Sequence, residues 1–303
     1  MKLKSKWPVR RFFACLGALY LFCAVTPLLF AESGTAKSES VFRIYDTATE
    51  TVRTVNDLDF LCGALPCEMA VSAPDEALKA QIIAIHTLYD RKRRENTGKD
   101  FDFTCDSAEK SIYTVDAGLT DEEQNRVRAL CLSVLDKEIY FENEPINACY
   151  FAISAGCTQP FENVWPEKSY PYLTAVACPS DLLAQGFQSA TTFTEDEIRA
   201  AFSEISFDDA PGKWFSDIQY FDTEYVEKLT VCGVEMTGVH VREALGLRSA
   251  SFTVTYENGA FTFTTLGYGH GVGMSQAAAI TLAEGGMTVD EILARFYPGT
   301  DIK

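Results

Sequence analysis

A glycine-rich loop near the C-terminus carries the residues whose spacing first suggests chemistry. Residues 267–276 read Gly-Tyr-Gly-His-Gly-Val-Gly-Met-Ser-Gln, with glycine at every second position from Gly267 to Gly273. This spacing lets the backbone approach a ligand or another segment closely. The loop lacks the Gly-Lys-Ser/Thr of a P-loop and the spacing of the dinucleotide fingerprint. A tight structural turn, with His270 bonded to backbone, and a ligand-facing loop are equally good interpretations.

Glu68 is a candidate acid because of its apolar neighbours. It lies between Pro66 and Met69, just before a predicted helix. Partial burial there would raise the pKa of its carboxyl group and keep it protonated. From these residues alone, a surface glutamate before a helix is the commoner interpretation.

Local signals define the elements that must position these residues. Asn56 is a predicted N-cap for a helix over 57–64, and Pro74 opens a longer helix with a predicted capping box of Ser72 and Asp75. Three further helices are predicted by Thr-x-x-Glu capping boxes: Thr120 with Glu123, Thr194 with Glu197, and Thr288 with Glu291.

Strands are predicted in two hairpins. Residues 251–265 alternate around Asn258-Gly259, a pair typical of a two-residue type I′ turn. Residues 138–156 predict a second hairpin that turns near Glu144-Pro145. Because helices and hairpins mix without strict alternation, the predicted fold class is α+β.

The N-terminus is basic, whereas the rest of the chain is strongly acidic. The formal net charge is −17, and the first eleven residues carry five basic side chains, so the remainder carries −17 − 5 = −22. A surface this acidic repels phosphate backbones, which argues against a nucleic-acid partner.

The N-terminal segment is predicted to meet a membrane. The basic residues precede an apolar run over residues 12–31, which is the pattern of an export signal or an anchor. Its length favours a retained single-pass anchor that leaves the rest of the chain outside the cell membrane. The predicted layout is a cytoplasmic tip with the anchor at 1–31, a linker at 32–40 and one domain at 41–303.

Eight cysteines follow the apolar run, and no C-x-x-C pair occurs among them. Disulfides in an exported protein and buried small apolar thiols are both open interpretations. The apolar surroundings of several favour the second, with one or two bridges left open.

Several segments in order resemble one family. The chain resembles stage II sporulation protein D and its relatives, which include amidase-enhancer proteins, over about residues 41–303. The segments that carry the resemblance are GYGHGVGMSQAAAITLAEGG (267–286), EILARFYPGTDI (291–302), VREALGLRSASF (241–252) and LCGALPCEMAVSAPDEALKAQIIAIHT (61–87).

The resemblance implies a membrane-anchored lytic transglycosylase. Such an enzyme cuts peptidoglycan between N-acetylmuramic acid and N-acetylglucosamine without water and needs no cofactor. The implied fold is an α+β domain around a glycan-binding groove, acting on strands stripped of stem peptides. The implied partners are peptidoglycan strands, the membrane and stage II sporulation proteins M and P, in septal wall remodelling during engulfment.

By the same resemblance, Glu68 is the catalytic acid. One carboxyl suffices because the nucleophile is the sugar's own 6-hydroxyl, whereas ordinary glycosidases need a second carboxylate. Further positions are implied to bind substrate, and each also has a structural interpretation such as a turn, a core residue or an N-cap. They are His86, Ser154, Tyr172, Asp181, His270, Ser275 and Gln276.

The chain departs from the family pattern at four places. Ala70 replaces a proline, His86 an arginine and Thr174 a lysine, so two fixed cations are missing, although a protonated His86 could replace one. Phe151 stands where some relatives have a metal-ligand histidine, which argues against a zinc site that uses Cys157.

Two rivals of other classes remain open. A non-catalytic glycan-binding or amidase-enhancer module would bind glycan without cutting it. A structural member of a division or engulfment complex would be recognised by its protein partners.

Overall fold

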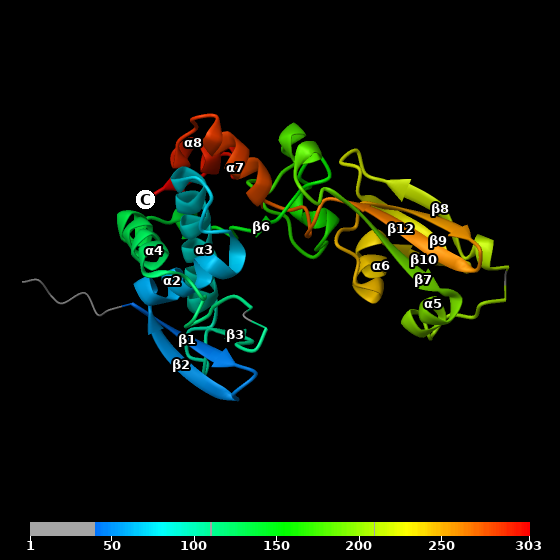
Figure 1. Cartoon of the computed structure of the whole chain (residues 1–303), viewed down its shortest axis with the longest axis horizontal. Helices are drawn as coiled ribbons and strands as arrows, with labels where there is room; N and C mark the ends of the chain where they lie inside the picture. Colours follow the sequence, from blue (N-terminus) through cyan, green and yellow to red (C-terminus); the bar gives the residue numbers. More distant parts are fainter. Residues whose placement is uncertain (1–39, 110, 209) are drawn as a thin grey trace, which may run out of the picture. The chain divides into compact units, whose positions relative to one another are not determined.

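The computed structural model describes residues 40–109, 111–208 and 210–303 (Figure 1). Val41–Lys303 form one compact unit of helices and small, mostly antiparallel sheets, which confirms the α+β prediction. The predicted tip, anchor and nearly all of the linker lie outside the described residues. Within the described ranges, no helix combines the length and apolar character needed to cross a membrane.

Helices and strands are mixed along the described chain without strict alternation. The α-helices are α2 (Asp57–Glu68), α3 (Asp75–Glu95), α4 (Asp121–Val134), α5 (Glu195–Ala201), α6 (Gly238–Leu245), α7 (Gln276–Glu284) and α8 (Val289–Phe296). Short 3₁₀ helices are η1 (Phe161–Asn163), η2 (Pro179–Leu183) and η3 (Pro211–Lys213).

The strands form several small sheets. Their orders are β2-β1-β3, β10-β9-β8, β11-β12-β7, β13-β6 and β14-β4-β5. The bounds are β1 (Val41–Asp46), β2 (Thr51–Asn56), β3 (Phe103–Cys105), β4 (Ile139–Phe141), β5 (Glu144–Pro145), β6 (Tyr150–Phe151), β7 (Gln188–Thr194), β8 (Phe215–Tyr220), β9 (Val226–Val231), β10 (Val234–Thr237), β11 (Phe252–Glu257), β12 (Ala260–Leu266), β13 (Met274–Ser275) and β14 (Asp301–Ile302).

One hydrophobic core surrounds α3. Leu78, Ile82, Ile83 and Ile85 are fully buried among α2, α4, α7 and α8. Figure 1 shows α3 as the long cyan helix, with α7 and α8 in red near one end. Because more than half of its residues are buried, including polar ones such as Gln81 and Asp90, α3 is a central helix that presents side chains to several neighbours at once.

A second core lies between sheets β11-β12-β7 and β10-β9-β8, with α5 and α6. Trp214 stacks on Phe261 with ring centroids 5.2 Å apart. The predicted hairpin at Asn258-Gly259 is confirmed, since both residues have positive φ, 53° and 82°, and β11 pairs with β12 across them.

Local capping explains most helix starts. The predicted N-cap Asn56 accepts a hydrogen bond from the backbone N–H of Asp59, and the three Thr-x-x-Glu capping boxes are all present. The predicted box at Ser72 is wrong. Pro74 is the N-cap of α3 and has no side-chain capping bond, while Arg126 binds the carboxylate of Asp75.

The predicted hairpin at 138–156 is much shorter than expected. Strand β4 pairs with β5 across Glu142-Asn143, both with positive φ, so the turn precedes Glu144-Pro145. The later residues Tyr150 and Phe151 instead pair in parallel with β13, at the start of α7. This long-range pairing brings the glycine-rich loop beside the middle of the chain.

Candidate active site

Glu68 is the last residue of α2. The helix ends there because Met69 adopts an extended conformation, with its N–H bonded to the Leu65 carbonyl. The amide Nε2 of Gln276 donates to the backbone carbonyl of Glu68 at 3.0 Å and to Oε1 of Gln81 at 3.2 Å. Gln276 therefore ties the end of α2 to α3 and α7, although Ala70 stands in place of a rigid proline.

The carboxyl group of Glu68 is half-buried. Burial raises its pKa, and this outweighs the opposing effects of a hydrogen bond from Tyr150 and the positive charge of Lys92. The phenol donates to the carboxylate, because that bond lowers the carboxyl pKa. A raised pKa makes a carboxyl group better able to keep a proton and to release it to a bound group.

Lys92 is the cation whose positive charge acts on Glu68. It lies on α3, with Nζ 4.6 Å from the ring centroid of Tyr89. Burial lowers its pKa, while the charges of Cys149, Glu95 and Glu68 act in the opposite direction. Residues 81 and 92 lie on one face of α3, about three helical turns apart.

His270 lies beside Tyr150. Its Nδ1 accepts a hydrogen bond from the N–H of Val272 at 3.1 Å, and its ring bonds the backbone of Tyr150. Burial, aided by the charge of Arg242, lowers the pKa of His270 to about 4, so its imidazole is neutral at pH 7. The ring centroid lies 5.2 Å from that of Trp165, which is 36% exposed.

Ser154, Asp181 and Ser275 form a buried cluster. Oδ2 of Asp181 accepts hydrogen bonds from the N–H and Oγ of Ser154, at 2.8 and 2.6 Å, and from Oγ of Ser275 at 2.6 Å. All three residues are inaccessible to solvent. The structure brings together these predicted substrate-binding residues, but as a core network that joins η2 to the start of α7.

Tyr172 and His86 lie apart from the carboxyl group of Glu68. The hydroxyl of Tyr172 accepts from the N–H of Asn147 at 3.0 Å within the core. His86 Nε2 lies 3.5 Å from Asp57 and 3.7 Å from Glu138 in a buried ion-pair cluster. Burial lowers the pKa of His86, but Asp57 and Glu138 outweigh this, and the net pKa is raised.

Sequence reasoning missed four residues of the site. Tyr150 and Lys92 act directly on Glu68, Gln81 is linked to it through Gln276, and Trp165 lines a pocket with Lys92, yet none stands out as a motif. The sequence holds a partial signal for Lys92, because it follows Gln81 at helical spacing on a helix that begins soon after Glu68. Tyr150 gives no such signal, because it reaches Glu68 only through the pairing of strand β6 with strand β13.

Two pockets meet at Lys92. One, of about 360 Å³, is lined by Lys92, Cys149, Phe161, Trp165 and Lys168, among others. The other, of about 740 Å³, is lined by Lys92, Asn96 and residues 98–104.

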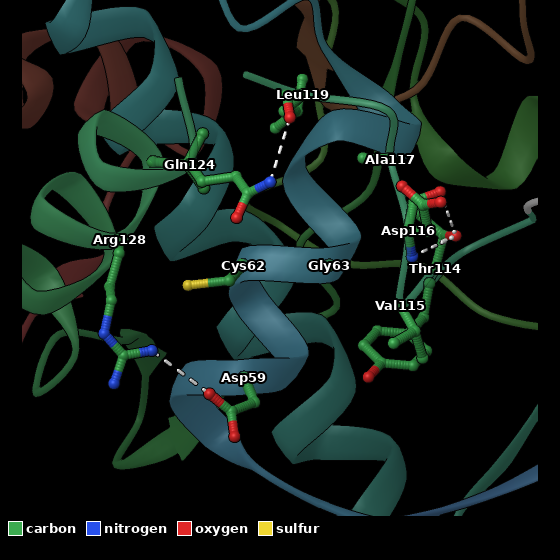
Figure 2. A pocket seen from close by; sticks show the side chains of 12 residues that line it. Asp59, Cys62, Gly63, Thr114, Val115, Asp116, Ala117, Leu119, Gln124 and Arg128 are labelled. Atoms are coloured by element: carbon green, nitrogen blue, oxygen red, sulfur yellow. Dashed lines mark hydrogen bonds and ion pairs between the residues drawn. The ribbon is translucent and has the colours of Figure 1, made fainter. Parts of the chain in front are cut away.

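A further pocket of about 360 Å³ lies between α2, α4 and residues 113–119 (Figure 2). Figure 2 shows the thiol of Cys62 pointing toward α4, and Arg128 paired with Asp59 at 3.3 Å. Glu68 does not line this pocket, which therefore belongs to a different surface.

The described residues hold neither a disulfide nor a cluster of metal-ligand side chains. No disulfide joins any of the eight cysteines in this part of the chain. Across residues 40–303, gaps excepted, no group of three or more His, Cys, Asp or Glu could hold a metal ion.

Comparisons with known proteins place this chain among sporulation proteins. The family model described as "Stage II sporulation protein" matches residues 45–132. Stage II sporulation protein D of Bacillus amyloliquefaciens is 30% identical over 90% of this chain and 81% of that protein. Stage II sporulation protein D of Bacillus subtilis (strain 168) is 30% identical over 86% and 78%. The amidase enhancer of the same organism is 25% identical over 80% of this chain and 40% of that longer protein.

Fold and site define an α+β protein that holds a half-buried glutamate between a tyrosine and a lysine. The similarity to the two stage II sporulation D proteins extends over most of each chain and therefore identifies the family. The chain belongs to the stage II sporulation protein D family.

Proposed function

We propose that this protein is a lytic transglycosylase of the bacterial cell wall with Glu68 as its acid and base. The observation that carries the proposal is the raised pKa of a half-buried Glu68 carboxyl group that also accepts a hydrogen bond from Tyr150. A family name tied to sporulation agrees with a role in wall remodelling.

The reaction needs one group that first gives and then takes a proton. Protonated Glu68 donates to the glycosidic oxygen as the bond from C1 of N-acetylmuramic acid breaks, and N-acetylglucosamine leaves with a free hydroxyl. The 6-hydroxyl of the muramic sugar then bonds to C1 and gives its proton to Glu68. The product is a 1,6-anhydro sugar, and the enzyme returns to its starting protonation state.

The surroundings of Glu68 suit a single-carboxyl mechanism. Lys92 is the charged side chain that shifts the pKa of Glu68, and no second acid contributes among the described residues. A second carboxylate at the spacing of ordinary glycosidases would act as nucleophile or water base. Two pockets that share Lys92 lie next to this cation and could take parts of a glycan strand.

The test uses the full-length protein and its Glu68→Gln variant on peptide-free glycan strands, with products weighed by mass spectrometry. We expect anhydro-ended sugars from the unaltered protein alone. Hydrolysed, non-anhydro ends would argue for a glycosidase instead. Absence of cleavage with retained glycan pull-down would replace the enzyme by a binding module.

A non-catalytic glycan-binding or amidase-enhancer role is the second candidate. It is favoured by the similarity to the amidase enhancer and by the absence of the family's cations at His86 and Thr174. Mixing the protein with an amidase and intact wall would reveal stimulation without any cleavage of its own.

The setting of the reaction follows from the same proposal. We place the domain outside the cell membrane, held by the apolar run at residues 12–31, with stage II sporulation proteins M and P as partners. Protease accessibility in intact cells tests the orientation. Affinity capture followed by mass spectrometry tests the partners.

A further inference from the structure

The pocket beside Lys92 combines an aromatic wall with two lysine side chains. Trp165 is 36% exposed, and its ring centroid lies 4.7 Å from that of Phe161. Both rings line the pocket of about 360 Å³, together with Lys92, Lys168 and Glu167. An exposed aromatic ring offers an apolar face to a flat, partly apolar ligand such as a sugar ring.

The ammonium groups of the two lysines make no direct contact with a carboxylate within the described part of the chain, although the charges of Glu68 and Glu95 act on Lys92. No hydrogen bond or ion pair joins Lys92 or Lys168 to a carboxylate there. On the same helix, by contrast, Arg91 binds Glu95 at 2.9 Å and Arg93 binds Asp57 at 3.1 Å. The Lys92 side chain is half-buried as well, so its charge acts in a less polar setting than bulk water.

We infer that this pocket is a subsite for a sugar ring that carries a carboxylate, with the ring on Trp165 and the carboxylate on Lys92. The inference rests on the proposed function, because the polymer there contains muramic acid. The lactyl carboxyl of that sugar is an amide where a stem peptide is attached and a free anion where it is not. Lys92 therefore favours the binding of strands without a stem peptide over strands that carry one.

Lys168 also favours the binding of a carboxylate in this pocket. It lies on the exposed rim of the pocket beside Glu167, so its charge is partly offset and screened by salt. We expect Lys92, which is less exposed, to carry most of the discrimination, and Lys168 to affect mainly its salt dependence.

The test compares two forms of one ligand. Peptide-free strands are used either untreated or with their lactyl carboxyls amidated by methylamine, which removes the charge and keeps the sugar chain. Binding is measured by calorimetry with full-length Glu68→Gln protein, so that no strand is cut. We expect untreated strands to bind about tenfold tighter, equivalent to about 1.4 kcal/mol.

Adding Lys92→Met should abolish that difference and leave both strands bound at the weaker level. Adding Trp165→Leu should weaken both strands alike, because the ring contributes contact area and not charge. Lys228→Met is the matched control, since Lys228 pairs with Glu235 in another sheet, and it should retain the full difference. Thermal unfolding of each variant verifies that it folds.

Equal binding of untreated and amidated strands, or discrimination that survives Lys92→Met, would overturn the inference. Failure to bind either strand would also overturn it. Preserved discrimination by a protein that never cleaves glycan would instead remove the proposed activity and leave the subsite in place.

Discussion

The phenol of Tyr150 donates a hydrogen bond to the carboxylate of Glu68, across two segments that are far apart in the chain. The bond stabilises the charged carboxylate and so opposes the effect of burial on its pKa. Tyr150→Phe should therefore raise the pKa of Glu68 further.

This shift has a definite sign in the pH profile of the proposed activity. The acid works when protonated, so kcat/KM falls as pH rises through the pKa of Glu68. In Tyr150→Phe this descending limb should move to higher pH. Tyr140→Phe, whose phenol bonds Glu138 at 2.7 Å, is the matched control and should leave the limb in place. A limb that moves to lower pH in Tyr150→Phe would contradict the assignment.

Asp181→Asn should destabilise the fold by about 2–4 kcal/mol. An amide oxygen is a weaker acceptor than the carboxylate oxygen that receives three hydrogen bonds from Ser154 and Ser275. Urea unfolding gives the free energy directly. The exposed Asp222→Asn should change it by less than about 0.5 kcal/mol, and equal effects of the two changes would argue against the buried cluster.

His86 should make stability depend on pH. Its pKa is raised in the folded protein, so its contribution is complete below its unfolded pKa and is lost as pH rises through the folded pKa. In His86→Gln, the free energy of unfolding should therefore fall more at pH 5.5 than at pH 8.5. These two values lie about one pH unit or more below and above the ordinary pKa of histidine. A larger loss at the higher pH would show that neutral His86 is the stabilising form.

Gly273→Ala should be much more disruptive than Gly286→Ala. Both glycines have positive φ, 79° and 90°, but a Cβ at Gly273 would lie 2.0 Å from the carbonyl oxygen of Cys149, whereas Gly286 faces open space. Expected losses are about 3 kcal/mol or more for the first and about 1 kcal/mol for the second. The midpoints of thermal unfolding of the two variants test this prediction. Similar midpoints would mean that Gly273 lies farther from Cys149 than the structure shows.

Cys62 should be alkylated faster than the buried Cys131 at neutral pH. A hydrogen bond from Cys131 lowers the pKa of Cys62, against the effect of burial, and Arg128 adds to the lowering. Peptide mass spectrometry after brief iodoacetamide treatment measures the order. Cys131→Ser should slow the reaction of Cys62 if the thiol donor matters, and Cys105→Ser is the control that leaves this pair intact.

Local sequence determined the elements that depend on neighbouring residues. Asn56 and the threonines before α4, α5 and α8 cap their helices because side chain and backbone lie within one turn. Asn258-Gly259 forms its hairpin because both residues accept positive φ. The same logic failed at Ser72, where Arg126 from another helix binds Asp75 instead.

The sequence, through its family resemblance, also singled out Glu68 and placed Ser154, Asp181 and Ser275 in one functional group. Only the tertiary structure decided that these three form a buried core cluster, and that His86 belongs to an ion-pair network with Asp57. Only it brought Tyr150, Lys92 and Gln276 to Glu68. The physical reason is that long-range pairing decides which groups reach a carboxyl group. The neighbouring residues in the chain indicate its partial burial, but they do not encode that pairing.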